Sequence, residues 1–129
     1  MTDLAACLGT GKGTWTGVLK LVSQPGFEQS FLVVNAWTKQ NLQLQKDNLH
    51  LVVINSEDNT NKMKDDIIKQ LEGKVKGFEV AVNLDSGSGK EHTALVTALI
   101  QLGFALRFVE MDGDNLTEIS QNQSFACEQ

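Results

Sequence analysis

Two stretches of this 129-residue chain share one pattern, in which an apolar run leads into a glycine-rich loop with one lysine and then into a helical periodicity. They are Leu4–Trp15, LAACLGTGKGTW, and Val80–His92, VAVNLDSGSGKEH. Glycine lets the backbone approach a ligand closely, and the helix N-terminus behind such a loop carries about half a positive charge. If the fold brings the two loops together, the sequence predicts a binding site for an anion.

Apolar runs and helical periodicities alternate along the chain, which predicts a parallel sheet with helices on both faces. Right-handed crossovers favour the strand order 3-2-1-4-5, and ligands bind where the winding reverses, between strands 1 and 4. The two glycine loops, residues 9–14 and 85–90, follow those two strands. The predicted strands are 3–8, 31–35, 49–55, 78–84 and 104–111. One helix is predicted to start at Thr14, a second to end at Gly73, and a third to span Lys90–Leu102.

The predicted fold class is α/β, a Rossmann-like open, mostly parallel sheet with a C-terminal edge hairpin. The turn residues 112–115 lead into an antiparallel strand at 116–119. Residues 38–48 fit a short helix, a strand fragment or a loop equally well. Residues 1–120 are predicted to form one domain, and residues 121–129 a polar tail.

The formal net charge of −5 argues against binding long nucleic acid, which needs a basic face. No apolar run approaches the length of about 18 residues that a membrane span needs, and the N-terminus lacks a signal pattern. We therefore expect a cytoplasmic protein without a membrane partner. Arg107 is the only arginine, so phosphate contacts must come from lysines, hydroxyls and the backbone.

Cysteine and histidine spacing indicates neither a disulfide framework nor a metal centre. Cys7 is predicted to lie in the core, and Cys127 in the polar tail. His50 opens a strand and is interpreted as structural. We expect no metal and no cofactor, and we interpret Asp112 and Asp114 as turn residues.

The first glycine loop reads Gly9-Thr10-Gly11-Lys12-Gly13-Thr14 and is predicted to cradle a phosphate or sugar, with Thr10 and Lys12 as donors. It lacks the G-x-G-x-x-G spacing of a dinucleotide fingerprint. The structural alternative is a tight strand-to-helix turn that needs glycine for its backbone conformation.

The second glycine loop is not a nucleoside-triphosphate loop, because Leu84 stands where that motif needs glycine and Glu91 where it needs Ser or Thr. Ser88 and Glu91 fit a capping box instead. Lys90 in the first turn opposes the helix macrodipole, a placement that becomes favourable beside an anion. Ser86 and Lys90 are therefore the main candidates.

The predicted site combines backbone amides with a few side chains. His92 is either a general acid or phosphate contact or an exposed helix residue. If the site is catalytic, Lys90, Ser86 and Lys12 would act without metal, stabilising a charged phosphorus transition state. The predicted ligand-binding residues are Gly9, Thr10, Gly11, Lys12, Ser86, Gly87, Ser88, Gly89, Lys90 and His92.

At these residues the chain resembles the CRISPR-associated Rossmann fold (CARF) domains. LGTGKGTW is similar to the L-G-T-x-x-G element after strand 1 of that family, and NLDSGSGKEHTAL to its N-x-T-G-G-T-K-x-M-x-x-A element after strand 4. The chain departs from the pattern at Asp85 and Ser86, where the family has Thr and Gly, and at Glu91 and His92, where it has small or apolar residues.

The resemblance implies a homodimer that binds a cyclic oligoadenylate, a small anionic nucleotide, across its two-fold axis. It implies either a ring nuclease, in which a ribose 2′-hydroxyl attacks the adjacent phosphate near Thr10, Lys12, Ser86 and Lys90, or a sensor that regulates a partner. The residues themselves leave two other interpretations open. One is a non-catalytic interaction module whose apolar helix 90–102 forms a subunit interface, and the other is a mononucleotide-binding subunit.

Overall fold

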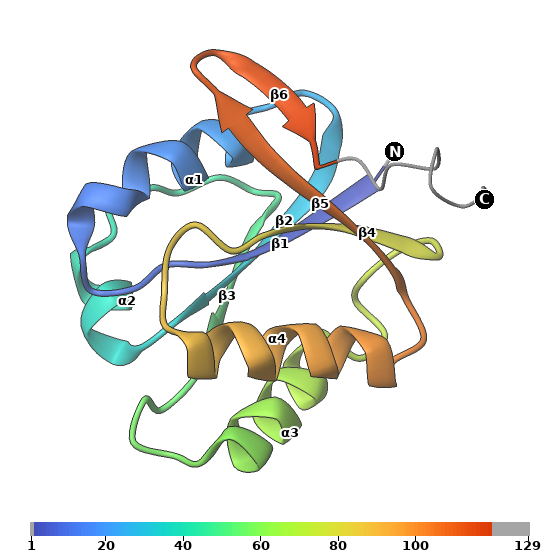
Figure 1. The fold of residues 1–129 in the computed structure, drawn as a ribbon. Helices are drawn as coiled ribbons and strands as arrows, with labels where there is room; N and C mark the ends of the chain where they lie inside the picture. The colour runs from blue at the N-terminus through green and yellow to red at the C-terminus, as the bar shows by residue number, and fades with distance from the viewer. Residues whose placement is uncertain (1, 120–129) are drawn as a thin grey trace, which may run out of the picture.

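Residues 2–119, which the computed structural model describes, form a six-stranded sheet in the order β3-β2-β1-β4-β5-β6 (Figure 1). The first five strands are parallel and β6 runs antiparallel to β5, which confirms the predicted strand order and the edge hairpin. The predicted tail and Cys127 lie outside the described residues. The elements are β1 Thr2–Cys7, η1 Lys12–Thr14, α1 Trp15–Val22, β2 Phe27–Val34, α2 Ala36–Asn41, β3 Leu49–Val53, α3 Thr60–Leu71, β4 Glu79–Asn83, α4 Gly89–Gln101, β5 Ala105–Asp112 and β6 Asn115–Glu118.

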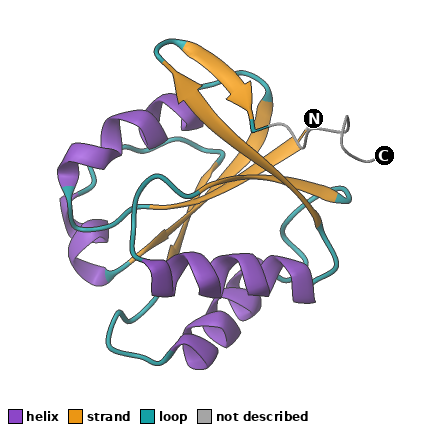
Figure 2. Cartoon of the chain, in the orientation of Figure 1, coloured by secondary structure: helices purple, strands orange, loops and turns teal. Residues whose placement is uncertain are grey.

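The central strands are buried on both faces, so successive residues feed two separate apolar cores. Ala5 and Cys7 of β1 face the core that α3 and α4 cover. Leu4 and Ala6 face the core beneath α1. Figure 2 shows this arrangement, with the sheet between the two layers of helix. The two layers hold the strand ends in place at the edge where β1 and β4 are followed by the glycine loops.

Strand β2 begins at Phe27, four residues before the predicted start at residue 31. The sequence did not predict this extension, because Glu28 and Gln29 are polar and precede the apolar run. They lie at the amino edge of the sheet, where Gln29 Nε2 donates a hydrogen bond of 3.0 Å to Oδ2 of the buried Asp3. The start of the segment left open at 38–48 is helical, because α2 begins just before it at Ala36 and ends at Asn41. An irregular stretch follows the helix.

Helix α4 packs one face deeply against the sheet and α3 and exposes the other. Ala94, Leu95, Ala98 and Leu99 are buried. Ile100 on the outer face is 59% exposed. The glycine after the helix, at position 103, has φ +93°, the left-handed conformation common just after a helix C-terminus. Within residues 2–119, no helix combines the length and apolar character needed to cross a bilayer.

Cys7 lies fully buried in β1, as predicted, and its burial perturbs its ionisation. Burial away from water, the larger cause, and the negative charge of Glu91, the smaller one, raise the pKa of the Cys7 thiol far above its usual range. The unfolded thiol ionises near pH 8.5, at about its reference value, while the folded thiol stays protonated. The folded state therefore holds the extra proton, and the free energy of unfolding must fall as pH rises above about 8.5.

This proton linkage predicts two results. The loss of stability between pH 8 and 10, roughly the range around the reference thiol pKa, should be smaller in Cys7→Ala than in the parent chain. In a Cys127→Ser background, a thiol reagent should modify Cys7 only as fast as the chain unfolds. Rapid modification in native buffer, or identical pH slopes in the two chains, would contradict the buried, protonated thiol.

Candidate functional site

The two glycine loops touch one another at the carboxyl edge of the sheet. A Cβ built on Gly9 would lie only 3.0 Å from both Cα and N of Gly87. Gly87 has φ +102°, and a Cβ there would lie 2.8 Å from Glu91 Oε1 and 3.0 Å from Cys7 Cβ. Both positions therefore need glycine, and the close approach places the loops after β1 and β4 side by side, as predicted.

A hydroxyl group fastens the two loops together. Ser86 Oγ accepts a hydrogen bond of 2.9 Å from Gly9 N–H, and it lies 2.6 Å from Thr14 Oγ1. Thr14 Oγ1 also lies 2.9 Å from the Gly11 carbonyl oxygen. Thr14 has one hydroxyl proton, so all these contacts are satisfied when Ser86 donates to Thr14 and Thr14 donates to Gly11.

This arrangement corrects the role that the sequence predicted for Ser86. The residue is 1% exposed, and its hydroxyl faces the first glycine loop instead of a ligand. The physical reason is that the Gly9 N–H lies in the contact between the loops, where it needs a hydrogen-bond acceptor. Ser86 is a residue that positions the loops, and the structure gives it no free hydroxyl for attack or proton transfer.

The first glycine loop is held from its other side by the Gly9 carbonyl. That oxygen accepts hydrogen bonds from Trp15 Nε1 at 2.8 Å and from Thr38 Oγ1 at 3.4 Å. Trp15 is 8% exposed and Thr38 is fully buried. Trp15 is therefore a core residue, and its indole N–H also fixes the start of the loop.

The second glycine loop ends in the predicted capping box. Ser88 Oγ accepts from Glu91 N at 3.3 Å, and Glu91 Oε1 accepts from Ser88 N at 2.9 Å. The first N–H groups of a helix have no acceptor within the helix. Those of Gly89 and Lys90, which open α4, are therefore the groups at this terminus that a ligand can use.

His92 completes the second loop from inside the first turn of α4. Its Nε2 lies 2.7 Å from the carbonyl oxygen of Ser86. Because a carbonyl only accepts, Nε2 must carry a proton. His92 is half-buried and supports the loop main chain. It is therefore not the freely exposed helix residue that the sequence offered as one alternative.

A cleft of about 420 Å³, called the narrow cleft, opens between the loops. The first loop lines it with Gly9, Thr10 and Gly11. The second loop contributes Gly87 and Ser88. These five of the predicted ligand-binding residues share one cavity, and the structure brings them together across more than 70 positions of sequence.

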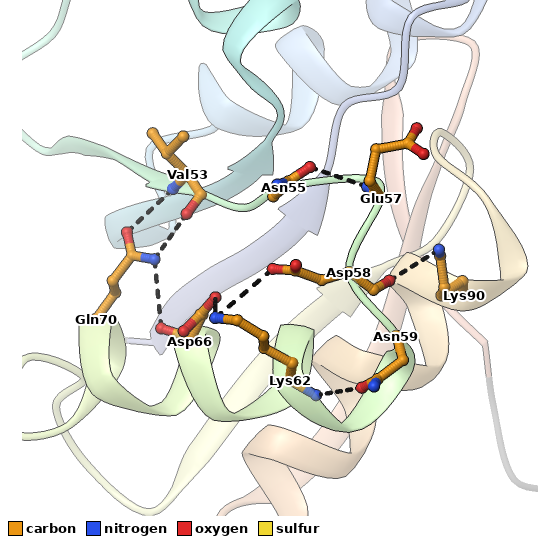
Figure 3. A network of polar contacts seen from close by, with 9 residues as sticks. All are labelled: Val53, Asn55, Glu57, Asp58, Asn59, Lys62, Asp66, Gln70 and Lys90. Carbon is orange, nitrogen blue, oxygen red and sulfur yellow. Dashed lines mark hydrogen bonds and ion pairs between the residues drawn. The ribbon is translucent and has the colours of Figure 1, made fainter.

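The two predicted lysines lie outside the lining of the narrow cleft. Lys12 Nζ lies 5.8 Å and 5.7 Å from the ring centroids of Trp15 and Trp37, which is cation–π geometry. Lys90 Nζ donates hydrogen bonds of 2.9 Å to the carbonyl oxygens of Ser56 and Asp58, in the loop between β3 and α3. Figure 3 shows the hydrogen bond to Asp58. Both ammonium groups thus have protein partners that the sequence did not predict.

The charged side chains that do line the narrow cleft are acidic, Asp85 and Glu91. The Asp85 main-chain N–H donates to Asn83 Oδ1 at 3.1 Å, while Asn83 Nδ2 donates to Asp85 Oδ2 at 3.1 Å. Glu91 is engaged in the capping box. The charged side chains in the lining are thus negative, and any anion here must rely on backbone amides and on lysines at the margin.

Sequence reasoning missed several residues of the site. The narrow cleft is also lined by Thr14, Asn35 and Ser56. Asn35 follows β2 and Ser56 comes soon after β3, so both stand at the carboxyl edge shared by all parallel strands. The signal that could have found Asn35 and Ser56 is their position as polar residues at the end of a predicted strand or just after it.

Among residues 2–119, no group of three or more His, Cys, Asp or Glu side chains is placed to hold a metal ion. Comparison with protein-family models and with curated proteins finds no match to this chain.

Proposed function

We propose that the narrow cleft binds a nucleotide-like anion, and that this ligand is a cyclic oligoadenylate held by two copies of the chain. The observation that carries the proposal is the contact between Gly9 and Gly87 at the switch point of the sheet. It brings main chain of both loops to one cavity, which Ser88, the N-cap residue of α4, also lines. Backbone amides bind phosphate without requiring an arginine.

The acidic lining supports a division of the ligand within the cleft. Phosphate oxygens would meet the amides of Gly89 and Lys90, where the helix dipole favours negative charge. The exposed Asp85 carboxylate would accept hydrogen bonds from ribose hydroxyls.

Binding without cleavage is the form of this function that the contacts favour. Cleavage by a ribose 2′-hydroxyl needs a group to take its proton and a group to protonate the departing 5′-oxygen. Ser86 is buried in the contact between the loops, while Lys90 is bonded to two carbonyls. Lys12 lies over two tryptophan rings. These engagements support a sensor, and a ring nuclease is the competing proposal.

The ligand is tested by thermal unfolding with cyclic tri-, tetra- and hexa-adenylate beside ATP, NAD and buffer. A ligand at 100 times its dissociation constant adds about 2.7 kcal/mol to the free energy of unfolding. Calorimetry should then give one cyclic ligand for two chains. Incubation with EDTA should return the ligand intact, and linear products would favour the nuclease instead. No stabilisation by any of these compounds would contradict the proposed ligand class.

The ammonium group of Lys90 provides a second test. It stands at the positive end of α4, so its removal should weaken binding of the stabilising cyclic adenylate roughly 3- to 10-fold. Lys76→Ala is the matched control, since Lys76 is an exposed lysine before β4, at the opposite edge of the sheet. Equal affinities for Lys90→Ala and Lys76→Ala would remove Lys90 from the site.

A further inference from the structure

A second and wider cleft of about 740 Å³ lies beside the first, at the carboxyl ends of β2 and β3. Asn35 and Ser56 line both clefts, so the two cavities share a wall. We propose that this wide cleft is the base subsite of the nucleotide, where Trp37 stacks on a purine that carries an exocyclic amino group. The inference rests on the proposed function and extends it to the part of the ligand that carries no charge.

Trp37 has the exposure and support that a stacking platform needs. It is 44% exposed and lines the wide cleft. Its ring meets the buried Trp15 ring at 62°, with 6.4 Å between centroids. Trp15 is anchored to the Gly9 carbonyl, so the aromatic pair is tied to the first glycine loop. Base–aromatic stacking on such a platform contributes substantially to nucleotide affinity.

The lining of the wide cleft offers acceptors for the amino group of a base. Asp58 and Asp66 line it, and both carboxylates face Lys62, whose Nζ lies 3.8 Å and 3.3 Å from them (Figure 3). The Asp66 carboxylate, with Asp58, raises the pKa of Lys62. Because the lysine balances part of the negative charge, these oxygens can accept from a neutral amine without requiring a cationic ligand.

Asn35 connects the two clefts chemically. Its Oδ1 accepts a hydrogen bond of 2.8 Å from Thr38 N–H, which assigns the side-chain oxygen and identifies the other polar atom, Nδ2, as a donor. An amide donor between a phosphate subsite and a base subsite is placed to contact ribose. The order phosphate, ribose and base then runs from the glycine loops past Asn35 to Trp37.

The test compares AMP, ribose 5-phosphate and cyclic tetra-adenylate on the intact chain. The chain has two tryptophans and no tyrosine, so tryptophan fluorescence reports only Trp15 and Trp37. We expect an adenylate to quench this emission and ribose 5-phosphate to leave it unchanged. In calorimetry, Trp37→Ala should weaken binding of the adenylate roughly 5- to 100-fold, whereas Trp37→Phe should retain most of the affinity.

The outcomes separate the two proposals. Adenylate binding that Trp37→Ala does not change would overturn the base subsite and leave the anion site in place. Failure of all three probes to bind would overturn both proposals. Ribose 5-phosphate should bind the parent chain and Trp37→Ala equally, which also verifies that the substitution leaves the fold and the narrow cleft intact.

Discussion

Replacing Gly87 with alanine should lower the free energy of unfolding by roughly 2–4 kcal/mol, the combined cost of a positive φ and of overpacking. A Cβ at this position would meet Cys7 Cβ at 3.0 Å, and Cys7 lies in a central strand that cannot move away. It would also meet Glu91 Oε1 at 2.8 Å. Moving that carboxylate would break its bond to Ser88 N and open the capping box.

Gly89→Ala is the matched control for this substitution. Gly89 lies two residues further on, begins α4, and has open space around a built Cβ. Alanine there should be neutral or stabilising by up to about 1 kcal/mol, because glycine is disfavoured in helices. Chemical denaturation of both variants decides the point. Equal stabilities would mean that the tight contact between the two loops does not exist in solution.

Ser86→Ala should destabilise the chain by about 1–3 kcal/mol, because it leaves the Gly9 N–H without its acceptor in the contact between the loops. Thr10→Ala, an exposed change in the same region, should alter stability by no more than about 0.5 kcal/mol. Both free energies come from denaturant unfolding. A loss below about 0.5 kcal/mol for Ser86→Ala would show that the hydroxyl does not join the loops.

A double-mutant cycle isolates the contact between the hydroxyl groups. Thr14→Val removes the hydroxyl that lies 2.6 Å from Ser86 Oγ and keeps the shape of the side chain. If Ser86 and Thr14 form one hydrogen-bonded chain, the two substitutions should be non-additive by about 0.5–3 kcal/mol. Additive effects would mean that each side chain acts alone.

Several features were predictable because they depend on local pattern or on general topology. Strand order followed from alternating strands and helices and from right-handed crossovers. The contact between the glycine loops followed from that order. The capping box was recognisable from Ser88 and Glu91 alone, and the left-handed glycine at 103 from its place after a helix.

The partners of the side chains were not predictable, because they come from segments distant in sequence. The Lys90 ammonium group donates hydrogen bonds to the carbonyl oxygens of Ser56 and Asp58, which lie more than 30 residues away in the sequence. Ser86 is drawn to an amide 77 positions earlier. The lysine side chain is also long and flexible, so its ammonium group can reach several acceptors. The residue type therefore predicts a positive charge but not its position. Sequence could thus place the loops, but it could not say which donors remain free.

The wide cleft was hidden for a related reason. Trp37 lies in α2, directly before the segment 38–48 whose periodicity did not decide between helix, strand and loop. Its proposed role depends on Trp15 and on the ends of two strands. Acidic residues at the narrow cleft were visible in the sequence. Their position in its lining became clear only from the fold.

Amide chemical shifts of the glycines test the central claim most directly, since the proposed site is built from backbone. On titration with cyclic tetra-adenylate, the glycine signals of the two loops, 9–14 and 85–90, should shift together and saturate. Signals of Gly26, Gly73 and Gly77, in the connections that precede β2 and β4 at the opposite edge, should stay in place. Unchanged loop signals at saturating ligand, or shifts confined to those three glycines, would contradict the account.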